Sequence, residues 1–238
     1  MIIIYIIFFI YALVFIRSFL CPSHPHVLNV YFGVPGSGKT TFAAHLTKWA
    51  LRENPLISFC RKHDNLVTRW ILNTGLLKRK IDVYSNVPIT GAYKLDPKSD
   101  IGYYMIENAK IIIDEAGIEY NNRSFKSFPA ESIYYYKYHR HYRTSVDVFS
   151  QSYDDMDITL RRLAQNFYVV RKSLIPFCVV ARRIRRKIGV DENTKQIADL
   201  YSMGLPVLDT QRIFSPPLWR LFNSYSRKEL PRKDWETW

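Results

Sequence analysis

Eight consecutive residues have the types and spacing of a loop that binds phosphate. Residues 33–40 fit the pattern G-x-x-x-x-G-K-[S/T], between an apolar strand expected at residues 28–32 and a helix expected at 42–52. Glycines let backbone N–H groups surround a phosphate at the start of a helix. Lys39 would neutralise the β- and γ-phosphates, and the Thr40 hydroxyl would bind Mg²⁺. A glycine-rich turn matching by chance is disfavoured because the strand and the helix flank the loop in register. The expected nucleotide-binding residues are Gly33, Val34, Pro35, Gly36, Ser37, Gly38, Lys39, Thr40 and Thr41.

Two adjacent carboxylates follow a second apolar run. Ile111, Ile112 and Ile113 precede Asp114 and Glu115. An Asp at a strand end next to a phosphate loop is placed to complete the Mg²⁺ site, and the following Glu to polarise an attacking water. A strand ending in Asp-Glu is common on its own, so the interpretation depends on the phosphate loop. Together the two motifs favour ATP hydrolysis over phosphoryl transfer by a nucleoside kinase.

Further candidates for catalysis come from a third strand and from arginines. Residues 146–150 form a strand pattern that ends at Gln151. In P-loop ATPases with a strand between the two motif strands, that strand ends in a polar residue facing the γ-phosphate; an ordinary exposed Gln is an equally good interpretation. Arg140 and Arg161, like their neighbours Arg143 and Arg162, are candidates for a finger that reaches the nucleotide of a neighbouring subunit in a ring.

Strand and helix patterns alternate along most of the chain. This alternation predicts an α/β fold of the P-loop NTPase type, with a mainly parallel sheet covered by helices on both faces. The expected helices are residues 42–52, 64–74, 131–141 and 157–166. The expected strands are residues 28–32, 56–60, 83–89, 110–114 and 146–151, followed by a hairpin of residues 167–171 and 177–184. In the helical stretch, Tyr134 to Tyr138 favour packing over base stacking.

The amino-terminal segment is the most hydrophobic part of the chain. Residues 1–16 are all apolar or aromatic, and Arg17 is the one charge before Pro22. A helix over residues 1–21 would be about 32 Å long, enough to span a bilayer. A cleaved signal peptide is disfavoured because no basic stretch precedes the run. A buried core helix is disfavoured because the run has no polar face. We therefore expect one N-terminal transmembrane helix at residues 1–21, an ATPase domain at 27–188 and an irregular basic tail at 189–238.

Charge and cysteine content exclude several classes of protein. The net charge is +13, and residues 161–238 carry 16 Lys and Arg against 7 Asp and Glu. The basic cluster at residues 182–187 could bind a nucleic-acid backbone, anionic lipid headgroups, or simply solvent at a hairpin edge. The 47% hydrophobic content excludes a disordered chain. Three scattered cysteines, and two histidines (His139, His141) without further ligands nearby, exclude a disulfide framework and a zinc site.

The ordered set of motifs resembles the zonular occludens toxin (Zot)-like family, the assembly ATPases of filamentous phages (inoviruses). The resemblance includes residues 33–41 and 111–117, the block His139-Arg140-His141-Tyr142, then Asp147, Gln151 and residues 157–161. It implies a ring-forming ATPase, using ATP and Mg²⁺, that drives virion assembly and extrusion through the host inner membrane. Coat protein or single-stranded DNA would be its partner. The family commonly places its membrane helix after the ATPase, whereas here the apolar segment comes first, with the ATPase domain expected in the cytoplasm. A DNA-translocating or packaging ATPase and a non-hydrolysing nucleotide-binding tether remain alternatives.

Overall fold

A nine-stranded sheet forms the centre of the protein in a computed structural model, which describes residues 5, 9, 12, 26–53, 55–63, 65, 66, 68, 69, 80–119, 129–190, 197–206 and 208–223. Its strands are β1 (Leu28–Phe32), β2 (Asp82–Ser85), β3 (Tyr93–Lys94), β4 (Ala109–Ile113), β5 (Ser145–Ser150), β6 (Asn166–Lys172), β7 (Cys178–Val190), β8 (Ile197–Met203) and β9 (Thr210–Phe214). The order is β3-β2-β4-β5-β1-β6-β7-β8, and β9 pairs with the first part of β7. Strands β3 to β6 along this order are parallel, while β7, β8 and β9 add antiparallel pairs.

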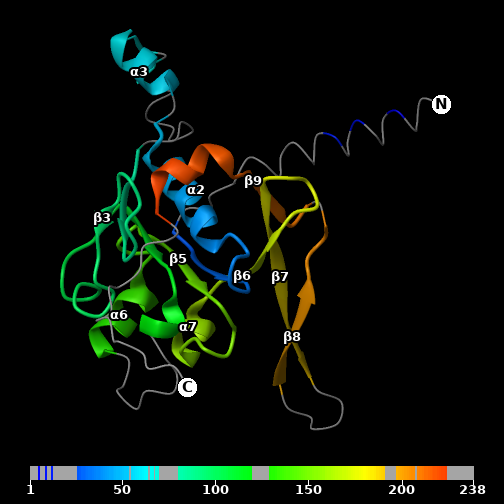
Figure 1. Ribbon diagram of the computed structural model, residues 1–238. Coiled ribbons are helices and arrows are strands. Elements are labelled where there is room, and N and C mark those ends of the chain that lie inside the picture. The colour runs from blue at the N-terminus through cyan, green and yellow to red at the C-terminus, as the bar shows by residue number, and fades with distance from the viewer. Residues whose placement is uncertain are drawn as a thin grey trace, which may run out of the picture.

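Helices cover both faces of the parallel part of the sheet. The helices are α2 (Lys39–Leu51), α3 (Pro55–Lys62), α5 (Ala116–Glu119), α6 (Ala130–Tyr138), α7 (Ile158–Leu163) and the 3₁₀ helix η1 (Pro216–Leu221). Helices α2 and η1 lie on one face, and α6 and α7 lie on the other (Figure 1). The far ends of β7 and β8 extend beyond the helices as a two-stranded arm (Figure 1). The predicted mainly parallel sheet, covered on both faces, is confirmed.

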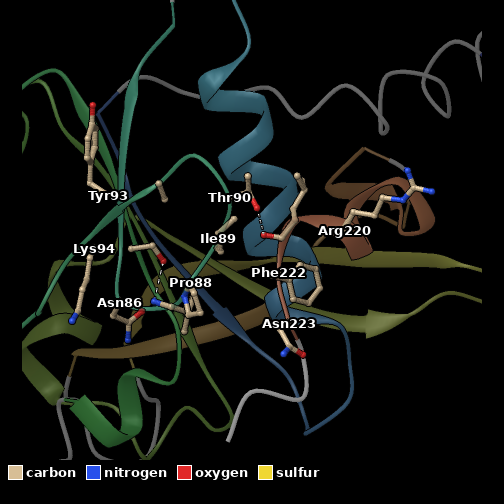
Figure 2. Close-up of a pocket in the computed structure, with 13 residues that line it drawn as sticks. Asn86, Pro88, Ile89, Thr90, Tyr93, Lys94, Arg220, Phe222 and Asn223 are labelled. Carbon is tan, nitrogen blue, oxygen red and sulfur yellow. Dashed lines mark hydrogen bonds between the residues drawn. The ribbon is translucent and has the colours of Figure 1, made fainter.

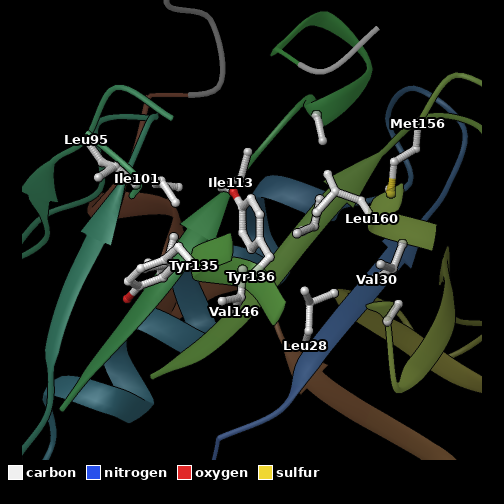
Figure 3. Packing of buried hydrophobic residues seen from close by; sticks show 14 of the residues in the cluster. Leu28, Val30, Leu95, Ile101, Ile113, Tyr135, Tyr136, Val146, Met156 and Leu160 are labelled. Atoms are coloured by element: carbon white, nitrogen blue, oxygen red, sulfur yellow. The ribbon is translucent and has the colours of Figure 1, made fainter. Parts of the chain in front are cut away.

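Two apolar cores lie on opposite sides of the sheet. Strand β1 contributes Leu28 and Val30 to the core under α6 and α7, where Tyr136 and Met156 are fully buried (Figure 3). The opposite core, under α2, contains Tyr31, whose ring stacks on those of Phe149 and Tyr168. Because both faces are covered, β1 and β4 are buried throughout, and β5 is buried from Val146 to Ser150.

A row of polar side chains crosses the buried sheet. Lys110 on β4 forms an ion pair with Asp147 on β5 (2.5 Å), and Asp147 accepts a hydrogen bond from Asn29 on β1 (2.7 Å). Asn166 on β6 donates to Asn29 (2.8 Å), and Arg183 on β7 donates to Asn166 (2.5 Å). We call Lys110, Asp147, Asn29, Asn166 and Arg183 the polar row. It joins five neighbouring strands, each through one side chain.

Several predicted elements differ from the structure. Residues 56–60 were expected to form a strand but belong to α3, where Ile57 and Cys60, three positions apart, are buried. Pro55 favours this helix because a proline fits at a first helical position. The strand predicted at residues 83–89 ends at Ser85, because the Ser85 side chain accepts a hydrogen bond from Val87 N–H and Pro88 has no N–H to continue the pairing. The helix predicted at 131–141 ends at Tyr138.

The prediction of an irregular tail from residue 189 onward is wrong for residues 189 and 190, which end β7. It is also wrong for residues 197–203, 210–214 and 216–221, which form β8, β9 and η1. Antiparallel pairing with the 13-residue strand β7 holds both strands, and such pairing leaves little local trace in a sequence. Residues 224–238 of that predicted tail lie outside the described residues.

The predicted membrane anchor and one predicted helix fall largely outside the described residues. Of residues 1–21, the structure describes Tyr5, Phe9 and Ala12, and of residues 64–74 it describes 65, 66, 68 and 69. Among the residues that the structure does describe, no helix has the length and apolar character needed to cross a membrane.

Candidate nucleotide-binding site

The loop between β1 and α2 has the backbone of a phosphate cradle. Gly36 and Gly38 have φ angles of 74° and 96°, in the left-handed region that glycine adopts without strain. A Cβ on Gly38 would also lie 2.6 Å from a side-chain carbon of Val179. Gly38 is the N-cap of α2, and among the described residues no side chain caps this helix and no acidic residue occupies its first turn. Its first N–H groups are therefore available to an anion.

Lys39 folds back over this loop. Its Nζ donates hydrogen bonds to the carbonyl oxygens of Gly33 (2.6 Å) and Val34 (3.2 Å), and the residue is 8% exposed. Burial lowers the pKa of the Lys39 amine, while the negative charges of Asp114 and Glu115 raise it. The Ser37 hydroxyl is also buried, and it has no hydrogen-bond partner among the described residues. A buried cation and an unsatisfied hydroxyl at one loop suit a bound phosphate.

The phosphate loop meets the acidic strand end directly. The Thr40 hydroxyl donates a hydrogen bond to Asp114 Oδ2 (2.8 Å), although 74 residues separate the two in sequence. Burial raises the pKa of the Asp114 carboxyl; the Thr40 hydroxyl and the Glu115 N–H, which donates to Asp114 Oδ1 (3.0 Å), act in the opposite direction. Hydroxyl and carboxylate oxygens are ligands that Mg²⁺ prefers, with phosphate oxygens and water completing its shell. Thr40 and Asp114 therefore fit a Mg²⁺ ion bound together with a nucleotide.

Glu115 has an unusual backbone conformation next to this pair. Its φ angle is 54°, in the left-handed region that costs a residue with a Cβ about 1–2 kcal/mol. The residue is exposed, whereas Asp114 is 4% exposed. Strained backbone of this kind is concentrated at functional sites, where the surrounding structure holds it in place. The arrangement separates two adjacent carboxylates into a buried one beside Thr40 and one open to solvent.

Strand β5 lies between β1 and β4, so Gln151 follows the strand between the two motif strands. The N–H of Gly33 donates to the carbonyl oxygen of Ser150 (3.2 Å), which brings the start of the phosphate loop next to Gln151. Gln151 is exposed and lines a largely apolar pocket of about 530 Å³ together with Val34 and Tyr153. The structure thus places Gln151 at the phosphate loop; its catalytic role remains a prediction.

The two candidate finger arginines occupy different places. The Arg161 guanidinium lies over the ring of Tyr153, 4.6 Å from the ring centroid, and 3.5 Å from a carboxylate oxygen of Asp154. Arg140 is exposed in the turn that precedes the start of β5. Because β1 and β5 are parallel, Arg140 lies at the opposite edge of the sheet from the phosphate loop. Within one chain, Arg161 is thus the candidate nearer to the site.

Asn86 is a site residue that the sequence did not indicate. Its side-chain amide donates to the Asp114 carbonyl oxygen and accepts from the Asp114 N–H, both at 2.8 Å. Asn86 was predicted to lie inside a strand, whereas the strand ends one residue earlier, at Ser85. The signal available in the sequence was a polar residue directly after β2, the strand that pairs with β4. Asn86 also lines a pocket of about 810 Å³, bordered by Thr90 and Phe222 (Figure 2).

We expect Asn86→Ala to impair hydrolysis more than nucleotide binding. The variant removes both hydrogen bonds that fix the Asp114 backbone, so the carboxylate loses its position relative to Thr40. The expected loss in kcat is about tenfold or more, since small misplacements of a reacting group have effects of this size. Steady-state kinetics would separate kcat from KM. Thr90→Ala is the matched control, because Thr90 borders the same pocket but bonds Leu221 (Figure 2). Equal kcat in both variants would contradict a positioning role for Asn86.

The fold and the phosphate loop together define the class of P-loop NTPases. Within this class, the fold is similar to that of the N-terminal domain of zonular occludens toxin from Neisseria meningitidis, at 15% sequence identity, covering 84% of this chain and 100% of that domain with a TM-score of 0.51. The predicted Zot-like P-loop fold is thus confirmed at the level of the fold.

Two further solved structures are less similar. The genome packaging NTPase B204 from Sulfolobus turreted icosahedral virus 2 is 13% identical, covering 78% of this chain and 100% of that one with a TM-score of 0.39. The flagellar accessory protein FlaH from Methanocaldococcus jannaschii is 11% identical, covering 78% and 94% with a TM-score of 0.40. No protein-family model and no curated protein matches the chain.

Proposed function

We propose that this protein is a P-loop ATPase that hydrolyses MgATP to drive assembly and extrusion of a filamentous phage at the host inner membrane. The observation that carries the ATPase part is the 2.8 Å hydrogen bond between Thr40 and Asp114, because it joins the phosphate loop and the acidic strand end into one site. The Zot-like order of motifs and the shared fold support the assembly part. Residues 1–21 would hold the protein in the membrane as a single span.

Each site residue has a distinct task in the proposed reaction. The N–H groups of the loop and the Lys39 amine would bind the phosphates, and Thr40 and Asp114 would hold Mg²⁺, which would supply positive charge to the phosphates. Glu115 accepts a proton from the attacking water, for which its exposed position next to Asp114 is suited. Gln151 and an arginine, Arg161 or Arg140, would contact the γ-phosphate, the arginine from a neighbouring subunit of a ring.

The decisive variant for hydrolysis is Glu115→Gln in the full, detergent-solubilised chain. We expect this variant to bind ATP with unchanged affinity and to release phosphate at least about 100-fold more slowly, the range that a general base contributes. Glu107→Gln is the matched control, because it removes the same charge from an exposed residue before β4. Phosphate release and nucleotide titration would be measured on both. Hydrolysis by Glu115→Gln at the wild-type rate would exclude Glu115 as the base.

The assembly role is tested by what stimulates turnover. We expect virion coat protein to raise the rate of hydrolysis of the full chain. Stimulation by single-stranded DNA without stimulation by coat protein would instead indicate a DNA-translocating or packaging motor. Turnover at background in a purified oligomer that binds ATP would indicate a nucleotide-binding membrane tether.

A further inference from the structure

A ridge of large apolar side chains projects from the side of the domain formed by the β6–β7 turn, the end of β9 and η1. Leu174 at the tip of the turn is fully exposed, and Phe177 and Trp219 are 62% and 54% exposed. Exposed apolar residues are ordinary when scattered singly, whereas a contiguous group marks an interaction surface. We call Leu174, Ile175, Phe177, Phe214 and Trp219 the apolar ridge.

Backbone and ring contacts make the ridge one continuous surface. The Ser215 N–H donates to the carbonyl oxygen of Phe177 (2.8 Å), which ties the end of β9 to the turn. The rings of Phe177 and Trp219 meet edge to face at 6.1 Å between centroids. Phe214 pairs with Cys178 in the β7–β9 ladder, next to Phe177. Three segments of the chain therefore present their apolar residues together.

The segments that form the ridge carry basic residues. The two segments that build it, residues 171–178 and 210–223, contain Arg171, Lys172, Arg212 and Arg220 and no Asp or Glu. The Arg220 side chain extends away from Phe222 and Thr90 (Figure 2). Clustered positive charge of this kind attracts a polyanion.

A small pocket next to Phe214 continues the positive charge inward. It has a volume of about 300 Å³ and is lined by Lys48, Arg52 and Arg212 as well as by Phe214 and Pro217. His45, also in its wall, has its pKa lowered to about 4, first by burial and then by the positive charges of Lys48 and Lys110. A pocket with cationic and apolar walls fits a phosphate group attached to a hydrocarbon.

We propose that the apolar ridge and its basic surround dock the folded domain onto an anionic lipid bilayer. Leu174 and Ile175 would enter the boundary of the hydrocarbon, Trp219 would lie at the headgroup level, and the basic residues would bind lipid phosphates. A nucleic acid is a poorer fit, because its bases could stack on Phe177 and Trp219 but would leave the exposed aliphatic side chains of Leu174 and Ile175 without an apolar partner. The inference goes beyond the proposed function, since it concerns the folded domain and not residues 1–21.

Hydrogen–deuterium exchange of the full chain in nanodiscs tests the docking surface. The discs contain phosphatidylcholine alone or phosphatidylcholine mixed with phosphatidylglycerol. We expect the amides of residues 173–178 and 215–221 to exchange about fivefold or more slowly in the anionic discs, since each basic residue near such a surface contributes a factor of about five. Equal exchange in the two kinds of disc would overturn the proposal.

Matched variants separate the ridge from general effects of charge and apolar surface. The double variant Lys172→Glu/Arg220→Glu, and separately Leu174→Ser, are expected to lose the slower exchange. Lys137→Glu and Met105→Ser, which change an exposed lysine and an exposed apolar side chain elsewhere, are expected to keep it. Loss of protection in these controls to the same degree would also overturn the proposal.

Other occupants of the surface give different results. Slower exchange on adding single-stranded DNA to phosphatidylcholine discs, with no effect of anionic lipid, would assign the ridge to nucleic acid. Slower exchange that grows with protein concentration in the same discs would assign it to a second copy of the chain. Carbonate extraction of vesicles reports separately on residues 1–21. Suppose that carbonate releases the chain from vesicles while anionic lipid still slows exchange at the ridge. The anchor in the proposed function would then be wrong, and the docking surface would still be supported.

Discussion

Replacing Lys39 with alanine is expected to weaken MgATP binding about 100-fold or more. The Lys39 amine is the buried cation of the phosphate loop, and its hydrogen bonds now go to two backbone carbonyls of that loop. When a nucleotide binds, charged phosphate oxygens would replace these neutral carbonyl oxygens as acceptors for Lys39. Each hydrogen bond to a charged group contributes about 1.5–3 kcal/mol. A loss of two such bonds accounts for the expected factor.

The same variant should fold normally, which separates binding from stability. Burial lowers the pKa of Lys39, so keeping its amine charged costs free energy in the protein without nucleotide. Removing that charge offsets the two lost carbonyl contacts, and we expect the free energy of unfolding to change by less than about 1 kcal/mol. Titration with a fluorescent ATP analogue and thermal unfolding would measure the two quantities. Lys48→Ala, an exposed lysine on the same helix, should leave binding unchanged. Wild-type affinity in Lys39→Ala would contradict the assigned phosphate site.

The parts of the site that the sequence predicted are those with local signals. The loop at residues 33–40 combines a strand, glycines at positive φ and a helix start within a few residues, so each residue type has a reason that does not depend on distant parts of the chain. Asp114 and Glu115 likewise follow an apolar run. The pair was predicted as the second motif that accompanies a phosphate loop, and Asp114 does meet Thr40 because parallel strands place their carboxyl ends at one edge of a sheet.

The features that the sequence missed depend on distant contacts. Asn86 bonds the backbone of a residue 28 positions away, and its place just after a strand depends on where Ser85 and Pro88 end that strand. Strands β8 and β9 form because β7 offers them a long partner, which their own composition does not reveal. Residues 56–60 are short and apolar enough to suit either strand or helix, and short apolar runs of this kind are ambiguous by pattern.

The polar row bears on a further problem, the register of the central strands. A strand buried on one face fixes its register through alternation of apolar and polar residues, but β1, β4 and β5 are buried on both faces. A slip by one residue would therefore change apolar burial little. It would, however, separate Lys110 from Asp147 and Asp147 from Asn29. We infer that the row selects the register that brings Gly33, Asp114 and Gln151 to the same edge.

The second large effect is therefore expected from Lys110→Met. Asp147 is fully buried, so among the described residues its carboxylate would keep, without Lys110, the hydrogen bond from Asn29 but no ion pair. Breaking one side of a buried ion pair costs about 3–5 kcal/mol, which corresponds to a midpoint of thermal unfolding lower by about 10 °C in a chain of this size. Circular dichroism of the detergent-solubilised chain during heating would measure it.

The double variant Lys110→Met/Asp147→Asn distinguishes a lost charge partner from lost packing. Asparagine keeps the acceptor for Asn29 and removes the buried charge, so we expect most of the lost stability to return. If the row also selects the register, the double variant should fold stably but bind ATP with weaker affinity, because alternative registers displace Gln151 relative to Gly33. Full recovery of both stability and nucleotide affinity would limit the row to balancing charge. Recovery of stability with weakened ATP affinity would show that the ion pair acts on the nucleotide site by aligning the strands. The ion pair itself lies toward the ends of the strands opposite those that carry the phosphate loop and Asp114.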